Sequence, residues 1–124
     1  MEKTIEKKFL GDTVIMKKLS SGMKCYIIPK MGYQSKMAVI CTRFGSNDIT
    51  YRLVGSKEKK NTPQGIAHFI EHKLFEQEWG DAFSAFVENG ASANAFTDFQ
   101  KTAYYFSCME KFEENLALLL RFVQ

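Results

Sequence analysis

Residues 62–75, with the sequence TPQGIAHFIEHKLF, hold both histidines of the chain, four residues apart. A helix fits this stretch, because Thr62 can serve as N-cap and Pro63 suits the first helical position. At about 100° per residue, one face carries polar groups and an aromatic ring, at His68, Glu71, His72 and Phe75. The opposite face is apolar, at Ile66, Phe69, Ile70 and Leu74. We therefore expect the apolar face to dock on a sheet while both imidazoles point away from it.

The two histidines are suited to holding a metal ion. His68 and His72 lie one helical turn apart, so a nitrogen of each ring can reach one cation at the roughly 2.0–2.1 Å expected for zinc. Zinc lowers the pKa of a bound water and polarises a carbonyl, and a neighbouring carboxylate can take the proton of the attacking water. The stretch therefore predicts a zinc site with Glu71 as general base. Catalytic zinc normally has three protein ligands, so one remains to be found.

The rest of the chain predicts an α+β fold. Strands are expected as a hairpin over 14–19 and 23–28, as a central strand over 36–43, and as a pair over 91–96 and 101–109 that turns near Asp98. Further helices are expected over 81–88, stopped by Asn89-Gly90, and over 112–123. Residues 48–61 show no strong period. Because the elements do not alternate strictly, we expect a mostly antiparallel sheet with helices packed on one face.

Composition limits the classes of partner. The 124 residues are 45% hydrophobic and 25% charged, enough for one compact core, so a single domain is expected over 1–124. A net charge of +3 does not favour nucleic acid. No apolar run is long enough to span a membrane, and the N-terminus has no targeting pattern. Three separated cysteines indicate a reducing compartment, with each expected as a small buried apolar residue. We expect a cytoplasmic protein without a membrane partner.

Three stretches together resemble a known family. Residues 62–75 have the inverted HxxEH order, 88–108 read ENGASANAFTDFQKTAYYFSC, and 20–29 read SSGMKCYIIP. This pattern resembles the inverzincin peptidases, the family of pitrilysin, insulin-degrading enzyme and mitochondrial processing peptidase. The resemblance implies a bacterial-type zinc endopeptidase acting on peptides or unfolded segments. It also implies the N-terminal part of a processing-peptidase-like half-unit.

The same resemblance implies missing parts. The third zinc ligand is expected to be a glutamate roughly seventy to eighty residues after the motif, which falls beyond Gln124. A related second domain or subunit is expected to close over the substrate. The helix over 112–123 ends without a stop signal, as expected of a fragment of a longer peptidase. We therefore expect this fragment to be inactive and to bind zinc weakly.

A second region is a candidate for binding the peptide substrate. Ala93 and Ala95 leave one strand face with little bulk, so an extended peptide could add to this strand, and by resemblance Asn94 would hydrogen-bond its backbone. The alternative is that these small residues only pack beneath the metal helix. Phe75 shares the histidine face and is expected to line the cleft. Lys73 stands where many members have methionine, and its amine is expected to reach solvent from the apolar face.

Two functions of different classes follow. The first is the zinc endopeptidase. The alternative is a non-catalytic partner subunit or peptide-binding member of the same fold, although such subunits usually lose the metal motif that this chain retains. A generic α+β binding domain with accidental histidines is the third possibility.

Overall fold

The computed structural model describes residues 4–124, which form two compact units, one that ends at Tyr33 and one that spans Gln34–Gln124. The first unit is an antiparallel sheet of β1 (Thr4–Phe9), β2 (Asp12–Lys18) and β3 (Lys24–Ile27), in that order. The antiparallel pairing of β2 with β3 confirms the hairpin that was predicted over 14–19 and 23–28. Strand β1 was missed, because its alternating acids and bases give no clear apolar face. Whether the whole chain acts as one domain stays a prediction.

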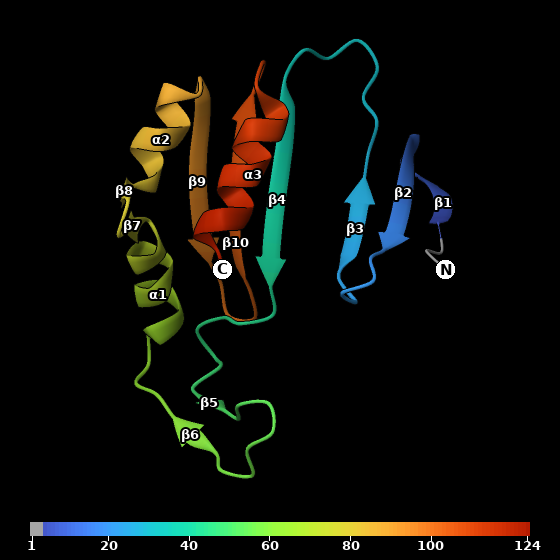
Figure 1. Cartoon of the computed structure of the whole chain (residues 1–124). Helices are drawn as coiled ribbons and strands as arrows, with labels where there is room; N and C mark the ends of the chain where they lie inside the picture. Colours follow the sequence, from blue (N-terminus) through green and yellow to red (C-terminus); the bar gives the residue numbers. More distant parts are fainter. Residues whose placement is uncertain (1–3) are drawn as a thin grey trace. The chain divides into compact units, whose positions relative to one another are not determined.

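The second unit carries an antiparallel sheet in the order β4-β10-β9, formed by β4 (Lys36–Thr42), β9 (Ala91–Thr97) and β10 (Thr102–Cys108) (Figure 1). Strand β10 is therefore central, whereas 36–43 was expected to be. Met37 and Val39 of β4 are 59% and 54% exposed, so the apolar composition of that strand does not reflect burial on both faces. Two short ladders, β5 (Thr50–Tyr51) with β6 (Lys60–Asn61) and β7 (Glu76–Gln77) with β8 (Gly80–Asp81), complete the strands.

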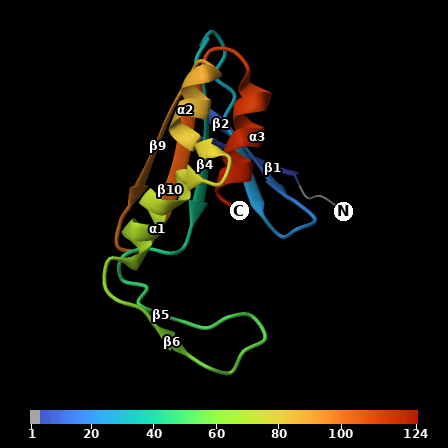
Figure 2. The same ribbon diagram turned by 60° about the vertical axis from the view of Figure 1, so that its left-hand side comes forward.

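Three helices, α1 (Ile66–Leu74), α2 (Ala82–Glu88) and α3 (Phe112–Phe122), cover one face of this sheet (Figures 1 and 2). Alternate residues of β10 point into the core, where Phe106 stacks on Phe86 of α2 with ring centroids 5.7 Å apart. Phe122 of α3 meets Phe86 edge to face at 5.9 Å. The α+β class, the antiparallel sheet and the one-sided helices are confirmed. Among the helices of residues 4–124, none is long and apolar enough to cross a membrane.

Helix α1 starts later than predicted. Its N-cap is Gly65, with φ 85°, and no side chain caps it. Thr62 instead stays with the residue before β5, since its backbone N–H and its hydroxyl both donate to the carbonyl of Ile49, at 2.8 and 3.2 Å, and the helix begins three residues later at Gly65. By contrast, α2 has a side-chain cap that the sequence analysis did not identify, since the Asp81 carboxylate accepts from the backbone N–H of Ser84 at 2.9 Å.

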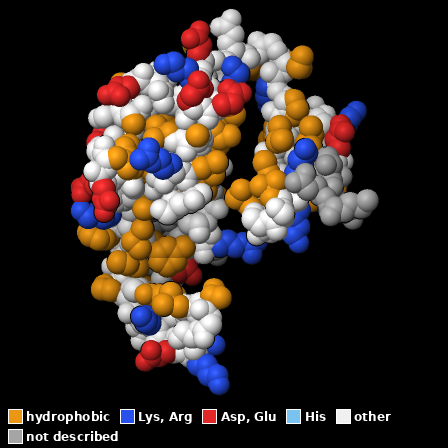
Figure 3. All heavy atoms as spheres, in the orientation of Figure 1, with side chains coloured by type: hydrophobic (Ala, Val, Ile, Leu, Met, Phe, Trp, Pro, Cys, Tyr) orange, Lys and Arg blue, Asp and Glu red, His pale blue; other side chains and the backbone are white. Residues whose placement is uncertain are grey.

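The buried face of α1 also differs from the prediction. Ala67 and Glu71 are buried, whereas Phe69 is 61% exposed. The helix is therefore turned by about a quarter of a revolution from the expected orientation, since each residue advances about 100°. In the space-filling view, apolar side chains reach the surface over α1 and over the β5–β6 segment (Figure 3). Phe69 is thus not an anchor to the sheet.

A close backbone crossing follows β4. The N–H groups of Ser46 and Asn47 donate to the carbonyls of Asp98 and Phe99, at 2.8 and 3.0 Å. A Cβ on Gly45 would lie 2.4–2.5 Å from three backbone atoms of the turn between β9 and β10. Only glycine fits this crossing without moving the turn. The predicted turn at Asp98 is confirmed, and the hydrogen bond from Lys101 is the main reason that the pKa of Asp98 is lowered.

The cysteines differ from the expectation that all three would be buried. Cys108 is buried, Cys25 is half-buried and Cys41 is exposed, and none forms a disulfide. Cys41 lies on β4, an edge strand whose odd-numbered residues point away from the helices.

Candidate metal centre

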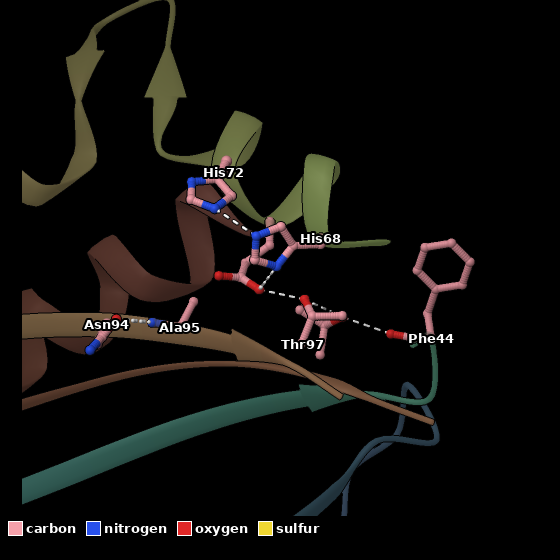
Figure 4. Close-up of polar contacts among 8 residues, drawn as sticks. Phe44, His68, His72, Asn94, Ala95 and Thr97 are labelled. Atoms are coloured by element: carbon pink, nitrogen blue, oxygen red, sulfur yellow. Dashed lines mark hydrogen bonds and ion pairs between the residues drawn. The ribbon is translucent and has the colours of Figure 1, made fainter. Parts of the chain in front are cut away.

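His68 and His72 project side by side from α1 (Figure 4). Their Nε2 atoms are 3.0 Å apart, and the ring centroids are 4.6 Å apart at an angle of 68°. The two Nε2 atoms therefore face each other across the gap between the rings. The His68 side chain is 62% exposed, so a cation can approach the pair from solvent.

The separation of the two nitrogens fits a shared zinc ion. Two nitrogens bound tetrahedrally at about 2.0–2.1 Å would lie roughly 3.3 Å apart, so small ring rotations would convert the observed pair into two ligands. His68, Glu71 and His72 offer atoms within 4.8 Å of one another. Within residues 4–124 no other group of three or more His, Cys, Asp or Glu side chains lies close enough to hold a metal ion. The described acids therefore offer no third ligand besides Glu71.

Glu71 lies beneath the histidines and is only 7% exposed. Its Oε2 accepts a hydrogen bond from the hydroxyl of Thr97 on β9. His68 Nδ1 lies 3.7 Å from the same oxygen, too far for a hydrogen bond. A buried carboxylate needs hydrogen bonds to offset the loss of water, and the described residues supply one through Thr97. Because α1 turns Glu71 toward the sheet, this contact offsets part of the cost of burying the carboxylate.

A second threonine supports the first. Thr102 lies opposite Thr97 in the β9–β10 ladder, is 2% exposed, and donates to the carbonyl of Phe44 at 2.7 Å (Figure 4). The two threonine hydroxyls are 3.3 Å apart. The sequence analysis did not identify either residue. The available signal was their position, since they flank the predicted turn at Asp98 and so had to face each other.

Tyr104 follows on the same face of β10 and is 5% exposed. Burial, and secondarily the charge of Glu71, raises the pKa of Tyr104 to about 12. Its hydroxyl therefore keeps its proton at neutral pH and cannot act there as a base. Tyr104 points inward and Tyr105 is only half-buried, in agreement with the alternation expected along this strand.

The predicted peptide-binding residues lie on β9, next to α1 (Figure 4). Ala93 and Ala95 pair with Phe106 and Tyr104 and pack against the core beneath the helices. Their small size is therefore explained at least by packing, which was the alternative interpretation. Asn94 lies on the opposite face and is exposed.

The side chain of Asn94 covers part of the strand edge. Strand β9 has β10 as its neighbour on one side and, within the described part of the chain, no strand on the other. The backbone N–H of Ala95 donates instead to Oδ1 of Asn94, at 2.8 Å. The edge of β9 thus offers a backbone donor that is occupied only by a side chain.

Phe75 does not line a cleft as expected. It is 6% exposed and stacks on Phe83 with ring centroids 3.9 Å apart at 8°, and on Phe122 at 4.9 Å. The rotation of α1 carries it into the core, so it is removed from the peptide-binding residues. Lys73 forms an exposed ion pair with Glu76, as expected for a lysine that reaches solvent.

Comparisons with known proteins agree with the motif. The family model described as Insulinase (Peptidase family M16) matches residues 53–124. The chain is 47% identical over 124 residues to the "uncharacterized zinc protease YmfH" of Bacillus subtilis strain 168, covering 100% of this chain and 29% of the relative. It is 28% identical to a proposed zinc protease of the same strain, AlbF, covering 97% of this chain and 28% of AlbF.

A solved structure gives the same result. The crystal structure of a proposed M16-like peptidase from Alicyclobacillus acidocaldarius superposes with a TM-score of 0.84 at 37% identity. The match covers 94% of this chain and 27% of that protein. The chain therefore spans less than a third of the length of the relatives that it matches.

Proposed function

Since the chain belongs to the insulinase family of peptidases, family M16, we propose that it supplies two ligands and the general base of a zinc endopeptidase acting on peptides or unfolded segments. One observation carries this proposal. Two exposed imidazoles with Nε2 atoms 3.0 Å apart stand above a buried carboxylate on the same helix. A structural role would explain one buried acid or one surface histidine, but not this combination.

Each residue of the site has its own role in the proposed reaction. His68 and His72 would hold the cation through their Nε2 atoms, which lie 3.0 Å apart. Zinc, when bound, lowers the pKa of a coordinated water and polarises the carbonyl of the bond to be cleaved. Glu71 accepts a proton from the attacking water and returns it to the leaving amine as the peptide bond breaks. The glutamate therefore ends each turnover in the state in which it began.

The edge of β9 is the proposed docking place for the peptide. An extended segment can pair with the N–H of Ala95 once Oδ1 of Asn94 releases it, and the Asn94 amide can then bond to the peptide backbone. Because β9 lies next to α1, the added strand would run past the histidines. This arrangement favours extended or unfolded segments over folded proteins as substrates.

Several parts of the proposed enzyme lie outside these 124 residues. We place the third zinc ligand, a glutamate on a helix, beyond Gln124, in a longer cytoplasmic peptidase of which this chain is the N-terminal part. A related domain or subunit closes over the peptide. The short coverage of the relatives supports this view. Alone, the 124 residues are expected to bind zinc weakly and to cleave nothing.

The test uses the longer protein. Zinc content is measured by elemental analysis in the wild type and in the His68→Ala and His72→Ala variants, and each variant is expected to lose its stoichiometric zinc. Glu71→Gln should retain zinc and lose cleavage of an unstructured peptide by about 10²–10⁴-fold. Glu76→Gln, which changes an exposed acid on the next element, is the control and should leave both unchanged.

Two results would contradict the proposal. Retention of zinc by both histidine variants would show that the metal binds elsewhere. Cleavage at the wild-type rate by Glu71→Gln would remove the glutamate from its role. Peptide binding without zinc or cleavage in the wild type would instead support the non-catalytic member of the fold.

A further inference from the structure

A hydroxyl from another element of the fold holds the proposed general base. Glu71 lies on α1, whereas Thr97 lies at the end of β9, yet the Thr97 hydroxyl bonds to Oε2 of Glu71. The direction of this bond is fixed when the carboxylate is ionised, because a carboxylate can only accept. A hydrogen bond to a charged group is also stronger than one between neutral groups.

The neighbouring threonine leaves this donor free for Glu71. Thr102 gives its one hydroxyl proton to the carbonyl of Phe44, which can only accept. Thr102 therefore cannot donate to Thr97 across the 3.3 Å between their oxygens. The Thr102 oxygen could also accept the Thr97 proton, but it is neutral and lies farther from Thr97 than the carboxylate of Glu71 does. The Thr97 proton thus points to Glu71, and the buried Thr102 fixes the oxygen behind it.

We propose that Thr97 is a positioning residue, which orients the carboxylate of Glu71 for proton transfer. This inference rests on the proposed function. By holding Oε2, Thr97 leaves the second oxygen, Oε1, as the one that faces the reaction, since the hydrogen bonds of the described residues use only Oε2. The valine isostere would fill the same space but release the carboxylate to rotate.

The hydrogen bond between Thr97 and Glu71 also links the proposed base to the strand proposed to bind the peptide. Thr97 lies two residues after Ala95, on the strand whose edge is proposed to bind the peptide. The element that sets the register of the peptide therefore also sets the position of the base.

The first measurement compares kinetics in the zinc-loaded longer protein. Thr97→Val is expected to lower kcat about 10–100-fold, the usual effect of losing a supporting hydrogen bond at a metal site, with KM changed less than about twofold and zinc content unchanged. Thr97→Ser, which keeps the hydroxyl, should restore most of the rate. Thr50→Val is the matched control, because its hydroxyl also bonds to a side chain, Asn61 Oδ1 at 2.8 Å, but away from the site.

The second measurement does not depend on activity. Crystal structures of the metal-free wild type and the Thr97→Val variant should show one carboxylate orientation for Glu71 in the former and a rotated or multiple orientation in the latter. An unmoved carboxylate, or a Thr97→Val protein with wild-type kcat, overturns the inference. If the wild type itself neither binds zinc nor cleaves, the proposed function fails, and the position of the carboxylate still decides the role of Thr97.

Discussion

Gly45→Ala should unfold the crossing beneath the β9–β10 turn. The new methyl carbon would lie 2.4 Å from the backbone nitrogen of Gln100 and 2.5 Å from the carbonyl oxygen of Asp98, whereas ordinary contacts of this kind exceed about 3.4 Å. The turn would have to retreat by about 1 Å. That movement would stretch the two hydrogen bonds from Ser46 and Asn47, each worth about 0.5–1.5 kcal/mol.

The expected cost follows from these contacts. Overpacking of a rigid site costs about 1–3 kcal/mol, so with the two weakened hydrogen bonds the free energy of unfolding should fall by about 2–5 kcal/mol. Urea denaturation can be followed by the fluorescence of Trp79, the one tryptophan of the chain, which lies under Arg121 with the guanidinium 4.7 Å from the ring. With a slope of about 1.5 kcal/mol per M, the midpoint should fall by about 1–3 M.

The control is a glycine where the backbone is strained but the space is open. Gly55 has φ 83° and nothing within 4 Å of an added Cβ, so Gly55→Ala should cost only the left-handed conformation, about 1–2 kcal/mol. A Gly45→Ala protein as stable as the wild type would show that the turn yields without loss, and the reasoning from close contacts would fail.

Other predictions concern pH, the peptide and the metal. Unfolded tyrosine ionises near pH 10.0 and folded Tyr104 near 12, so the contribution of Tyr104 to the free energy of unfolding should be present at neutral pH and fall by about 2–3 kcal/mol as the pH rises from 10 through 12. Denaturation of Tyr104→Phe should lack this step, and Tyr105→Phe should keep it. Asn94→Ala in the longer protein should raise KM for an extended peptide by up to about tenfold with kcat unchanged, whereas equal effects in Ser92→Ala would contradict a specific contact. Zinc at about 100 times its Kd should raise the free energy of unfolding by about 2.7 kcal/mol, and this gain should be absent in His72→Ala.

The sequence predicted the parts of the fold that local patterns determine. The β2–β3 hairpin, the helix α2 with its stop at Asn89-Gly90 and the β9–β10 turn at Asp98 all depend on residues close together in the chain. The predicted start of α1 was wrong because Thr62 stays with the β5–β6 segment, bonded to Ile49 thirteen residues earlier, and the helix begins only at Gly65. No local pattern could reveal that competing contact.

The candidate site also combines features that local sequence patterns predict with features that they do not. The HxxEH spacing places His68, Glu71 and His72 together on any helix, so their proximity could be predicted from the sequence. The rotation of α1 could not, because it is set by contacts with residues far along the chain, such as the packing of Phe75 on Phe122 and the hydrogen bond from Thr97 to Glu71. That rotation buried Phe75 and exposed Phe69, which reversed the roles expected for the two aromatic residues.

The bond between Asn94 and Ala95 has a consequence for solubility. An open strand edge is a template on which a second molecule can add its own strand, the first step toward aggregation. A short side chain that occupies the outward N–H makes such pairing less favourable, yet it can be displaced by a partner that offers several hydrogen bonds at once. In Asn94→Ala this protection would be lost, and light scattering should detect larger particles at high protein concentration. The same amide that would admit a peptide would thus keep copies of the protein apart.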